Sequence, residues 1–411
     1  MKILFINKYD TNGGAAIAAW RLHEQLVKAE NTEDRFVVGI KKSSSDIVFS
    51  ARKPGLENNI EKGINFFTNQ LGLQYKWFPF STGRIKRYAE EFQPDIISLH
   101  NIHGGYFKTS LMEYLSALAP VVWTLHDMWA FTANAAHTFG DESWKQMKAG
   151  KRERKLFPSI GLPLGNMLLK NKKKIYGHSH LTVVTPSRWL FHLAEQSPLL
   201  EGKKIVQVYN GIDLDKFRPS DKANAKKRAG IDPGLKVISF SAEKLMQSEH
   251  KGGQLLLEVL RLLDLEKQPV CILTIGGGHI HHSFKYIQIK PLGYVTDESL
   301  YIQYLQASDI YIHPTKADTL PNTLIEAIAC GIPCITFDVG GCAEIIQHNE
   351  NGLVIEPGNA AVFVKNIRYL LDNESLYAGF SQNARRIAEE RFDVKTMGER
   401  YFELFESLAV K

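Results

Sequence analysis

The chain has 411 residues, of which 44% are hydrophobic and 23% are charged, and its net charge is +6. This length and balance predict a globular protein with two domains and exclude a disordered or fibrous chain. Because no apolar run approaches about 18 residues, we expect no helix that spans a membrane.

The cysteines and the first residues predict a cytoplasmic location. Four cysteines are too few for a disulfide framework in a chain of this length. Residues 1–6 turn polar at Asn7, which is too early for a signal peptide. No metal site is expected, because Cys330 and Cys334 fit a helix end and a buried strand, and the histidines of residues 279–282 lack a carboxylate partner.

The first half of the chain alternates between predicted strands and helices. Residues 2–6 predict a strand and residues 15–29 a helix, joined by a turn that ends in Gly13 and Gly14. Such a turn favours phosphate binding, although a plain tight turn fits as well, and it lacks the G-x-G-x-x-G spacing of NAD and FAD sites. Further strands are predicted at residues 35–40, 95–100, 121–125, 181–185 and 205–209, with helices at 58–71 and 111–118. This alternation predicts a parallel, doubly wound sheet.

Two histidines stand where predicted strands end. His100 begins a glycine-rich loop over residues 100–106, and His126 follows the strand at residues 121–125. Ligands bind at the carboxyl ends of parallel strands, so both histidines are candidate site residues. A buried polar plug is the alternative for His126.

A basic segment follows at residues 145–174, where ten lysines or arginines face one acid. The positive charge of this segment alone exceeds the net charge of the whole chain, so the basic residues are concentrated in one place. A solvated, partly ordered insertion is one interpretation, and a peripheral patch on anionic lipid is the other. A nucleic-acid site is disfavoured, because Phe157 is the only aromatic residue in the segment for base stacking.

The alternation restarts after a polar, lysine-rich stretch at residues 220–234, which reads as a connector. A strand is predicted at residues 237–241, and Lys244 and Lys251 then precede a helix. Lysines at a helix N-terminus can neutralise a diphosphate, and solvated surface is the alternative.

The most informative stretch runs from His313 to Glu344. Pro321 and Asn322 predict a helix start and Gly331 its end, which leaves Glu326 inside an apolar helix. Carboxylates at Asp318 and Glu326 could accept hydrogen bonds from ribose or sugar hydroxyls. Taken alone, the two acids are better explained by an ordinary surface helix.

The whole string is more specific than its two acids. Asp318, Glu326, the Ala-x-Ala-x-Gly-x-Pro run and the Gly340-Gly341-x-x-Glu344 loop resemble the sugar-nucleotide signature of retaining GT-B glycosyltransferases, in particular their family four. Asp318 departs from the family, which usually has Glu there.

The resemblance implies an α/β protein of the GT-B fold, with two doubly wound, parallel-sheet (Rossmann-like) domains facing a cleft. Residues 1–208 would bind the acceptor and residues 209–392 the nucleotide sugar. Residues 393–411 would form a last helix that crosses back to the first domain.

The resemblance also implies roles for individual residues. Those expected at the reaction centre are His126, Asp318, Glu326 and Lys251. Those expected to bind the donor are Gly13, Gly14, Lys244, Lys251, Gly293, Tyr294, Val295, Leu320, Asn322 and Glu326. No cofactor or metal is implied beyond the nucleoside-diphosphate sugar.

The function expected from these observations is retaining transfer of a hexose-type sugar to a glycan acceptor, lipid-linked, in surface polysaccharide synthesis. The partners would be the nucleotide sugar, the acceptor and the anionic inner face of the cell membrane, with no nucleic acid. A sugar-nucleotide epimerase or hydrolase of the same fold is the alternative, and a basic nucleic-acid-binding module is a weaker one.

Overall fold

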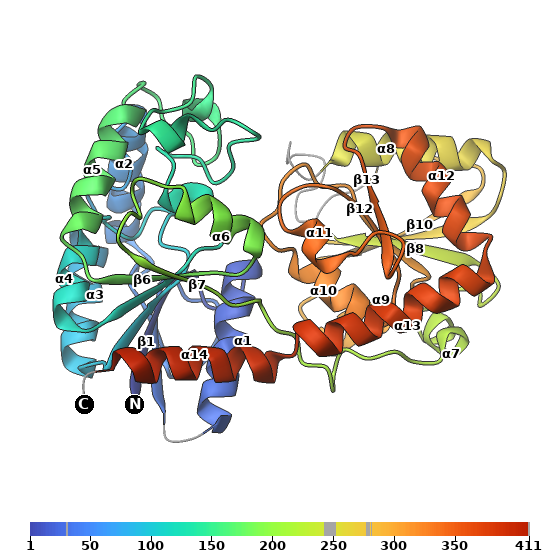
Figure 1. Cartoon of the computed structure of the whole chain (residues 1–411), viewed down its shortest axis with the longest axis horizontal. Coiled ribbons are helices and arrows are strands. Elements are labelled where there is room, and N and C mark those ends of the chain that lie inside the picture. The colour runs from blue at the N-terminus through green and yellow to red at the C-terminus, as the bar shows by residue number, and fades with distance from the viewer. Residues whose placement is uncertain (30–31, 242–251, 277–279, 281, 410–411) are drawn as a thin grey trace. The chain divides into compact units, whose positions relative to one another are not determined.

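The computed structural model describes residues 1–29, 32–241, 252–276, 280 and 282–409 (Figure 1). Its contacts divide the chain into two compact units. Unit 1 comprises residues 1–211 and 394–411, and unit 2 comprises residues 212–393. Lys244 and Lys251, two of the expected donor-binding residues, lie outside the described residues.

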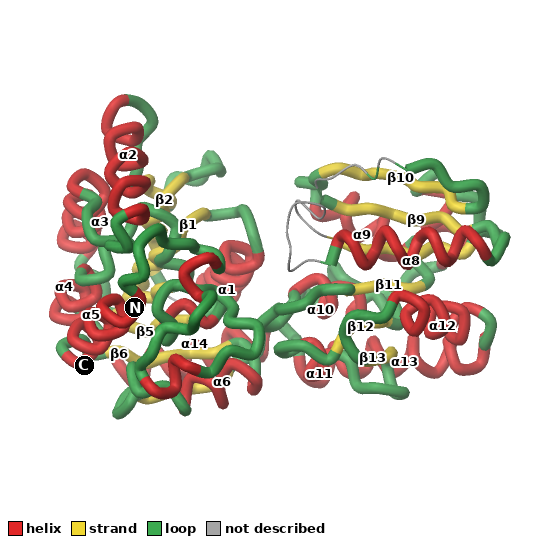
Figure 2. Tube along the Cα trace, turned by 90° about the horizontal axis from the view of Figure 1, so that it is seen from above, coloured by secondary structure: helices red, strands yellow, loops and turns green. Residues whose placement is uncertain are grey.

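Unit 1 is built on a parallel sheet whose strand order is β3-β2-β1-β4-β5-β6-β7. Figure 2 shows strands lying between helices in each unit, as expected of a doubly wound sheet. The elements of unit 1 are β1 (Lys2–Tyr9), α1 (Gly14–Ala29), β2 (Glu33–Ile40), β3 (Val48–Ser50), α2 (Leu56–Gln70), α3 (Pro79–Phe92), β4 (Ile96–Leu99), α4 (Leu111–Leu118), β5 (Val121–Thr124), η1 (Met128–Ala130), η2 (Ser143–Gln146), η3 (Glu153–Lys155), α5 (Gly165–Gly177), β6 (Leu181–Thr185), α6 (Arg188–Glu195), β7 (Lys204–Gln207) and α14 (Val394–Leu408).

Unit 2 repeats the design with the strand order β10-β9-β8-β11-β12-β13, again parallel. Its elements are α7 (Lys222–Arg228), β8 (Lys236–Ser241), α8 (Gly253–Leu265), β9 (Val270–Ile275), β10 (Ile287–Gly293), α9 (Glu298–Gln306), β11 (Ile310–His313), α10 (Asn322–Ala329), β12 (Cys334–Phe337), α11 (Cys342–Ile345), β13 (Gly352–Ile355), α12 (Ala360–Leu371) and α13 (Glu374–Arg391).

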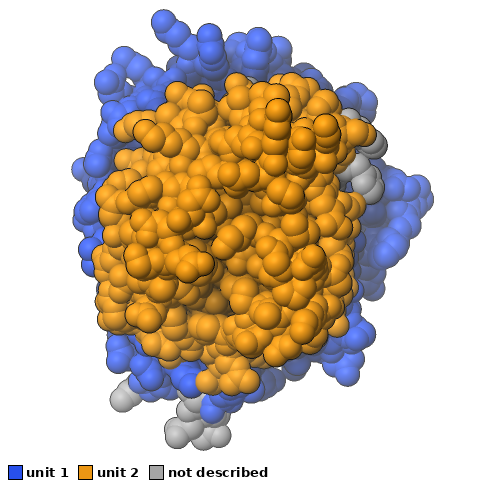
Figure 3. Space-filling view, turned by 90° about the vertical axis from the view of Figure 1, so that its right-hand side faces the viewer, with its two compact units in different colours: residues 1–211, 394–411 blue, residues 212–393 orange. Residues whose placement is uncertain are grey.

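Each unit, coloured separately in Figure 3, has its own hydrophobic core. The central strands are buried along their whole length and mostly apolar, because helices cover both faces of each sheet. The order of the strands reverses between β1 and β4 in unit 1 and between β8 and β11 in unit 2. Ligand sites of doubly wound sheets lie beyond the carboxyl ends of the strands at such a reversal.

The last helix, α14, packs on α1 in unit 1. The Tyr401 hydroxyl lies 2.9 Å from Oγ1 of Thr124, the last residue of β5. Gly398 lets the helices approach closely, because a Cβ there would lie 2.6 Å from the Gln25 side chain. The final residues are therefore part of unit 1.

The prediction of a plain connector over residues 220–234 is wrong. Helix α7 lies in this stretch and packs on α9, with Ala225 and Ile231 buried. The lysines do not prevent packing, because their aliphatic stems can be buried while the ammonium finds a partner. Lys226 is 4% exposed, and its Nζ lies 2.7 Å from Oδ2 of Asp309.

One of the two interpretations of residues 145–174, a partly ordered insertion, is also wrong. Glu153 and Leu169 are buried there, and Oε1 of Glu153 accepts hydrogen bonds from the backbone amides of Ala133 and Asn134. Lys172 is 4% exposed, and its Nζ donates to the carbonyl oxygens of Trp129 and Thr132. The segment is therefore folded into unit 1, and not all of its charges are available to a partner.

Lys172 gives the stability of the protein a pH dependence. Burial lowers the pKa of Lys172 to about 7, although Glu153 and Asp127 act in the opposite direction. Between pH 7 and pH 10.5 the unfolded chain binds more protons at this lysine, so the free energy of unfolding rises with pH. The contribution of this group should be on the order of 3–5 kcal/mol over that window.

We predict that Lys172→Met loses this part of the pH dependence. Urea unfolding of the wild type and the variant between pH 7 and pH 10 measures it. Lys173→Met is the matched control, because Lys173 is exposed. Parallel stability curves for the wild type and Lys172→Met would contradict the prediction.

Candidate functional site

The passage from β11 to α10 forms the centre of the candidate site in unit 2. Pro321 caps the helix and Asn322 is its first residue, which differs slightly from the predicted start with Pro321 in the first turn. Gly331 has φ +70°, the left-handed conformation predicted for the helix end. The side chain of Leu320 is buried, whereas Asn322 is half-buried.

Glu326 is not the acid of an ordinary surface helix. It is 5% exposed, and its Oε2 accepts a hydrogen bond from the Tyr301 hydroxyl at 2.7 Å. Burial, and then the charge of Glu326, raises the pKa of Tyr301 well above its ordinary value, so the hydroxyl remains a donor. Tyr301 was not predicted from sequence, because its contact depends on how α9 packs beside α10.

Asp318 lies in a loop that is joined to the glycine turn after β12. Its backbone oxygen accepts a hydrogen bond from the Gly341 amide at 3.2 Å. Gly340 has φ +57°, and a Cβ there would lie 1.7 Å from the same oxygen. The Asp318 side chain is 20% exposed, and its Oδ2 lies 3.6 Å from Nε2 of His313. The two ends of the sequence signature therefore meet in space.

The start of α8 reaches the same loop. Gly252 has φ +75°, and a Cβ on it would lie 1.9 Å from the carbonyl oxygen of Pro314. Only glycine allows this approach. The positive end of the α8 dipole is thus placed next to the loop that leads to Asp318.

The expected donor-binding residues Gly293, Tyr294 and Val295 lie at the end of β10 and in the loop that leads into α9. Gly293 has φ +64°, and its carbonyl oxygen accepts a hydrogen bond from the Gly276 amide at 2.7 Å. Tyr294 is 53% exposed and Val295 is half-buried. Helix α9 follows this loop and carries Tyr301, whose hydroxyl donates to Glu326. One helix therefore connects the loop to the Glu326 site.

In unit 1, His100 and His126 form a pair at the ends of β4 and β5. Nδ1 of His100 lies 3.0 Å from Nε2 of His126, and the rings stack at 5.3 Å. Burial, and then His126, lowers the pKa of His100 well below its ordinary value. Burial also lowers the pKa of His126 to about 4, with Asp127 opposing and His103 adding to the shift. Both imidazoles are therefore neutral at pH 7, and act as hydrogen-bonding groups.

A second pair, His103 and Asp127, lies beside the first. Nε2 of His103 lies 2.6 Å from Oδ2 of Asp127, and the Trp129 amide donates to Oδ1. Burial raises the pKa of Asp127, but His103 and the hydrogen bonds outweigh it and keep the pKa below its ordinary value. The four side chains line one small cavity. We did not predict a role for Asp127, although its position directly after His126 was a usable signal.

The turn at Gly13 and Gly14 lies near the reversal point of the unit 1 sheet. Gly13 has φ +87°, and both glycines are exposed at the start of α1. The Asn7 side chain joins three segments there, because it donates to the Ala15 carbonyl and accepts from the backbone amides of Lys8 and Asn101. The turn is thus held beside the end of β4.

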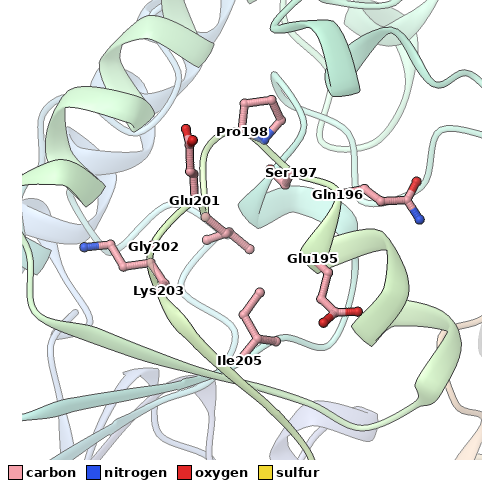
Figure 4. Close-up of a pocket in the computed structure, with 9 residues that line it drawn as sticks. Glu195, Gln196, Ser197, Pro198, Glu201, Gly202, Lys203 and Ile205 are labelled. Atoms are coloured by element: carbon pink, nitrogen blue, oxygen red, sulfur yellow. The ribbon is translucent and has the colours of Figure 1, made fainter.

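A hollow of about 510 Å³ lies elsewhere in unit 1, and Figure 4 shows residues that line it. Its lining comes from the end of α6, the following loop and β7, and includes Glu195, Glu201, Lys203 and Ile205. It contains none of the expected site residues.

Two further properties concern the part of the chain that the structure describes. None of its helices is both long and apolar enough to cross a membrane. It also contains no group of three or more histidine, cysteine, aspartate or glutamate side chains placed to hold a metal ion.

Two family models match the sequence almost end to end. Glycosyltransferase Family 4 matches residues 12–216, and Glycosyl transferases group 1 matches residues 221–387.

Individual relatives agree with the family matches. The chain is 26% identical over 207 residues to an N-acetyl-alpha-D-glucosaminyl L-malate synthase of Bacillus anthracis, covering 48% of this chain and 52% of the relative. The match spans about half the length of this and the other first relatives. A longer match reaches WcaC of Escherichia coli strain K12, whose name refers to colanic acid biosynthesis, at 22% identity over 87% of this chain and 88% of that protein.

A solved structure shows the same fold over the whole chain. HepE of Anabaena, crystallised with UDP and glucose, superposes with a TM-score of 0.68 at 18% identity, covering 99% of this chain and 100% of that one. The predicted GT-B fold is confirmed by this likeness and by the two parallel sheets.

Proposed function

The chain belongs to the glycosyltransferases, in the families group 1 and family 4, and we propose that it moves a sugar from a nucleoside-diphosphate sugar to a glycan acceptor. The observation that carries this proposal is Glu326, a buried carboxylate in α10 beyond the carboxyl end of β11. One oxygen of this carboxylate accepts a hydrogen bond from the Tyr301 hydroxyl, and an ionised carboxylate can accept further hydrogen bonds, such as those from the hydroxyls of a ribose.

The donor would be bound by groups of unit 2. Glu326 would accept hydrogen bonds from the ribose, and Asp318 from hydroxyls of the sugar. The α8 N-terminus would attract the diphosphate, with Lys251 and Lys244 adding charge. Backbone groups of residues 293–295 would contact the base, and Leu320 would contribute through its backbone, because its side chain is buried.

We propose that transfer retains the configuration of the sugar. The acceptor oxygen would attack the sugar carbon from the face that the phosphate leaves. The carbon–phosphate oxygen bond breaks as the new glycosidic bond forms, and the acceptor proton passes to the departing phosphate. Positive groups at the phosphate stabilise charge that grows as the bond breaks. Neutral His126 would contact a sugar hydroxyl near the reacting carbon.

The acceptor would be a glycan carried on a lipid, and the product a surface polysaccharide. WcaC and a Staphylococcus aureus relative, CapM, are named for such pathways, and a Campylobacter jejuni relative for an acceptor on diphospho-undecaprenol.

The experiment that tests the transferase proposal measures release of nucleoside diphosphate. Nucleotide sugars, UDP-glucose first, are screened by their effect on the melting temperature, because a ligand at 100 times its dissociation constant adds about 2.7 kcal/mol of stability. The nucleotide sugar that stabilises the protein is then incubated with and without lipid-linked saccharides. Release that requires an acceptor supports a transferase, whereas release without one would indicate a hydrolase.

We predict that transfer needs no divalent metal. The negative charge of the diphosphate can be offset by the α8 N-terminus and the two lysines. Activity should therefore be the same in a chelator as in added magnesium or manganese. Loss of activity in the chelator and recovery with either metal would contradict this prediction.

A further inference from the structure

Helix α2 buries polar side chains and exposes large apolar ones. Its buried residues are Glu61 and Thr68. Large apolar side chains on its other sides are exposed by 41–76%, and another follows directly after the helix: Leu56, Ile60, Phe66, Phe67 and Leu71. The spacing of Leu56, Ile60, Phe67 and Leu71 gives one continuous helical face. A contiguous apolar face of this kind marks a binding surface.

A second apolar segment borders the C-terminal end of α2. The amides of Gly161 and Leu162 donate to the carbonyl oxygens of Asn69 and Gln70 at 2.9 and 3.0 Å. Leu162 is 48% exposed and Phe157, in the same loop, is 64% exposed. Trp77, which follows α2 in the chain, is 54% exposed. We call these residues, together with the exposed apolar residues of α2 and Leu71, the α2 surface.

The charges around the α2 surface are positive. Lys62 and Lys76 are exposed on and after α2, and Arg154 and Lys155 are exposed beside the second segment. Nη1 of Arg154 donates to the Gly161 carbonyl at 2.8 Å, which fixes this arginine at the border. Of the two acids in α2, Glu61 is buried and Glu57 is paired with Arg84. Aromatic and aliphatic groups rimmed by cations are typical of helices that lie in the interface of an anionic bilayer.

The inner side of α2 contacts the loop after β4, which carries part of the unit 1 site. The Asn65 side chain packs against this loop, since a Cβ on Gly105 would lie 3.2 Å from its Nδ2. Phe157 of the α2 surface also lies edge-on to His103, with 6.3 Å between ring centroids. His103 is in turn bonded to Asp127. The α2 surface is therefore continuous with the loop after β4.

We propose that the α2 surface lies on an anionic lipid bilayer, so that the loop after β4 meets an acceptor whose lipid is held in that bilayer. Figure 2 shows α2 at one edge of unit 1. The second part of the proposal rests on the proposed transferase function. One interpretation of the sequence is lipid binding by residues 145–174 as a whole. In this proposal only residues 154–162 of that segment contact the bilayer, together with α2.

The test is sedimentation of the full chain with vesicles of phosphatidylcholine, with and without phosphatidylglycerol, at low and high salt. We expect binding to the anionic vesicles only, weakened by salt because exposed charges are screened. Phe66→Ser combined with Phe67→Ser should reduce the bound fraction about tenfold. Leu265→Ser combined with Tyr369→Ser is the matched control, because these side chains are exposed by 74% and 51% on unit 2. Equal melting temperatures check that both variants are folded.

Three results would overturn the proposal. They are binding to neither vesicle type, equal binding to both, and equal losses in the two double variants. A dimer in lipid-free solution that Phe66→Ser with Phe67→Ser dissociates would also overturn it, and would assign the face to a second copy. The melting-temperature shift with nucleotide sugar is measured separately. Its absence would count against the transferase function and leave the vesicle result intact.

Discussion

Replacing Glu326 with glutamine is expected to lower turnover about 10- to 150-fold while the protein stays folded. Glutamine keeps an oxygen that can accept from the Tyr301 hydroxyl, which lies 2.7 Å from Oε2 of Glu326. It removes the negative charge, so the proposed ribose contact loses its charge-assisted part, worth about 1.5–3 kcal/mol. Turnover with a saturating acceptor, measured as diphosphate release, and the melting-temperature shift with the donor report the loss.

Alanine at the same position should abolish turnover but is a less informative change. It also takes the acceptor of this hydrogen bond away from Tyr301, which costs about 1–3 kcal/mol of stability at a buried site. Tyr301→Phe separates the two effects, because it removes the hydrogen bond and keeps the carboxylate. Wild-type turnover in a folded Glu326→Gln protein would show that the carboxylate does not bind the donor.

The parallel sheets could be predicted from sequence because their strands are apolar on both faces. Residues 96–99 and 334–337, for example, are short, mostly apolar runs that alternate with helical patterns, which is typical of a parallel sheet, and both are buried in the structure. Helix α7 was missed because its sequence lacks such apolar residues. Its sequence is mostly lysine and alanine, and only tertiary packing, with Asp309 as a partner for Lys226, makes that composition suitable for burial.

Candidate site residues that belong to one local sequence pattern could be predicted. Contacts between residues of distant segments could not. The spacing from Asp318 to Glu344 identified one loop, one helix and one glycine turn. The pairing of His103 with Asp127, and of Tyr301 with Glu326, depends on how separate elements pack, which residue spacing does not encode. The helix over α2 was also predicted, but its outward apolar face became visible only from the burial of Glu61 and Thr68.

The close approach of Gly340 to Asp318 leads to the second large effect. We expect Gly340→Ala to lower the free energy of unfolding by about 3–5 kcal/mol. The backbone at Gly340 is left-handed, with φ +57°, and an added Cβ would lie 1.7 Å from the Asp318 carbonyl oxygen. That oxygen belongs to backbone, so the loop must move and the hydrogen bond from the Gly341 amide must lengthen or break. A misplacement of about 1 Å at a reacting centre can cost about 100-fold in rate. Turnover per folded molecule of the Gly340→Ala variant should therefore fall as well.

Gly358→Ala is the control that separates the clash from the backbone conformation. Gly358 is also left-handed, with φ +97°, and lies in the same unit, but an added Cβ would meet no atom within 4 Å. Its substitution should therefore cost only the conformational strain, about 1–2 kcal/mol, and leave donor binding unchanged. Urea unfolding and the melting-temperature shift with nucleotide sugar, measured on both variants, test the difference. If Gly340→Ala loses no more stability than Gly358→Ala and binds the donor normally, the contact between the two loops does not hold Asp318 in place, and its proposed role at the sugar hydroxyls would lose its structural basis.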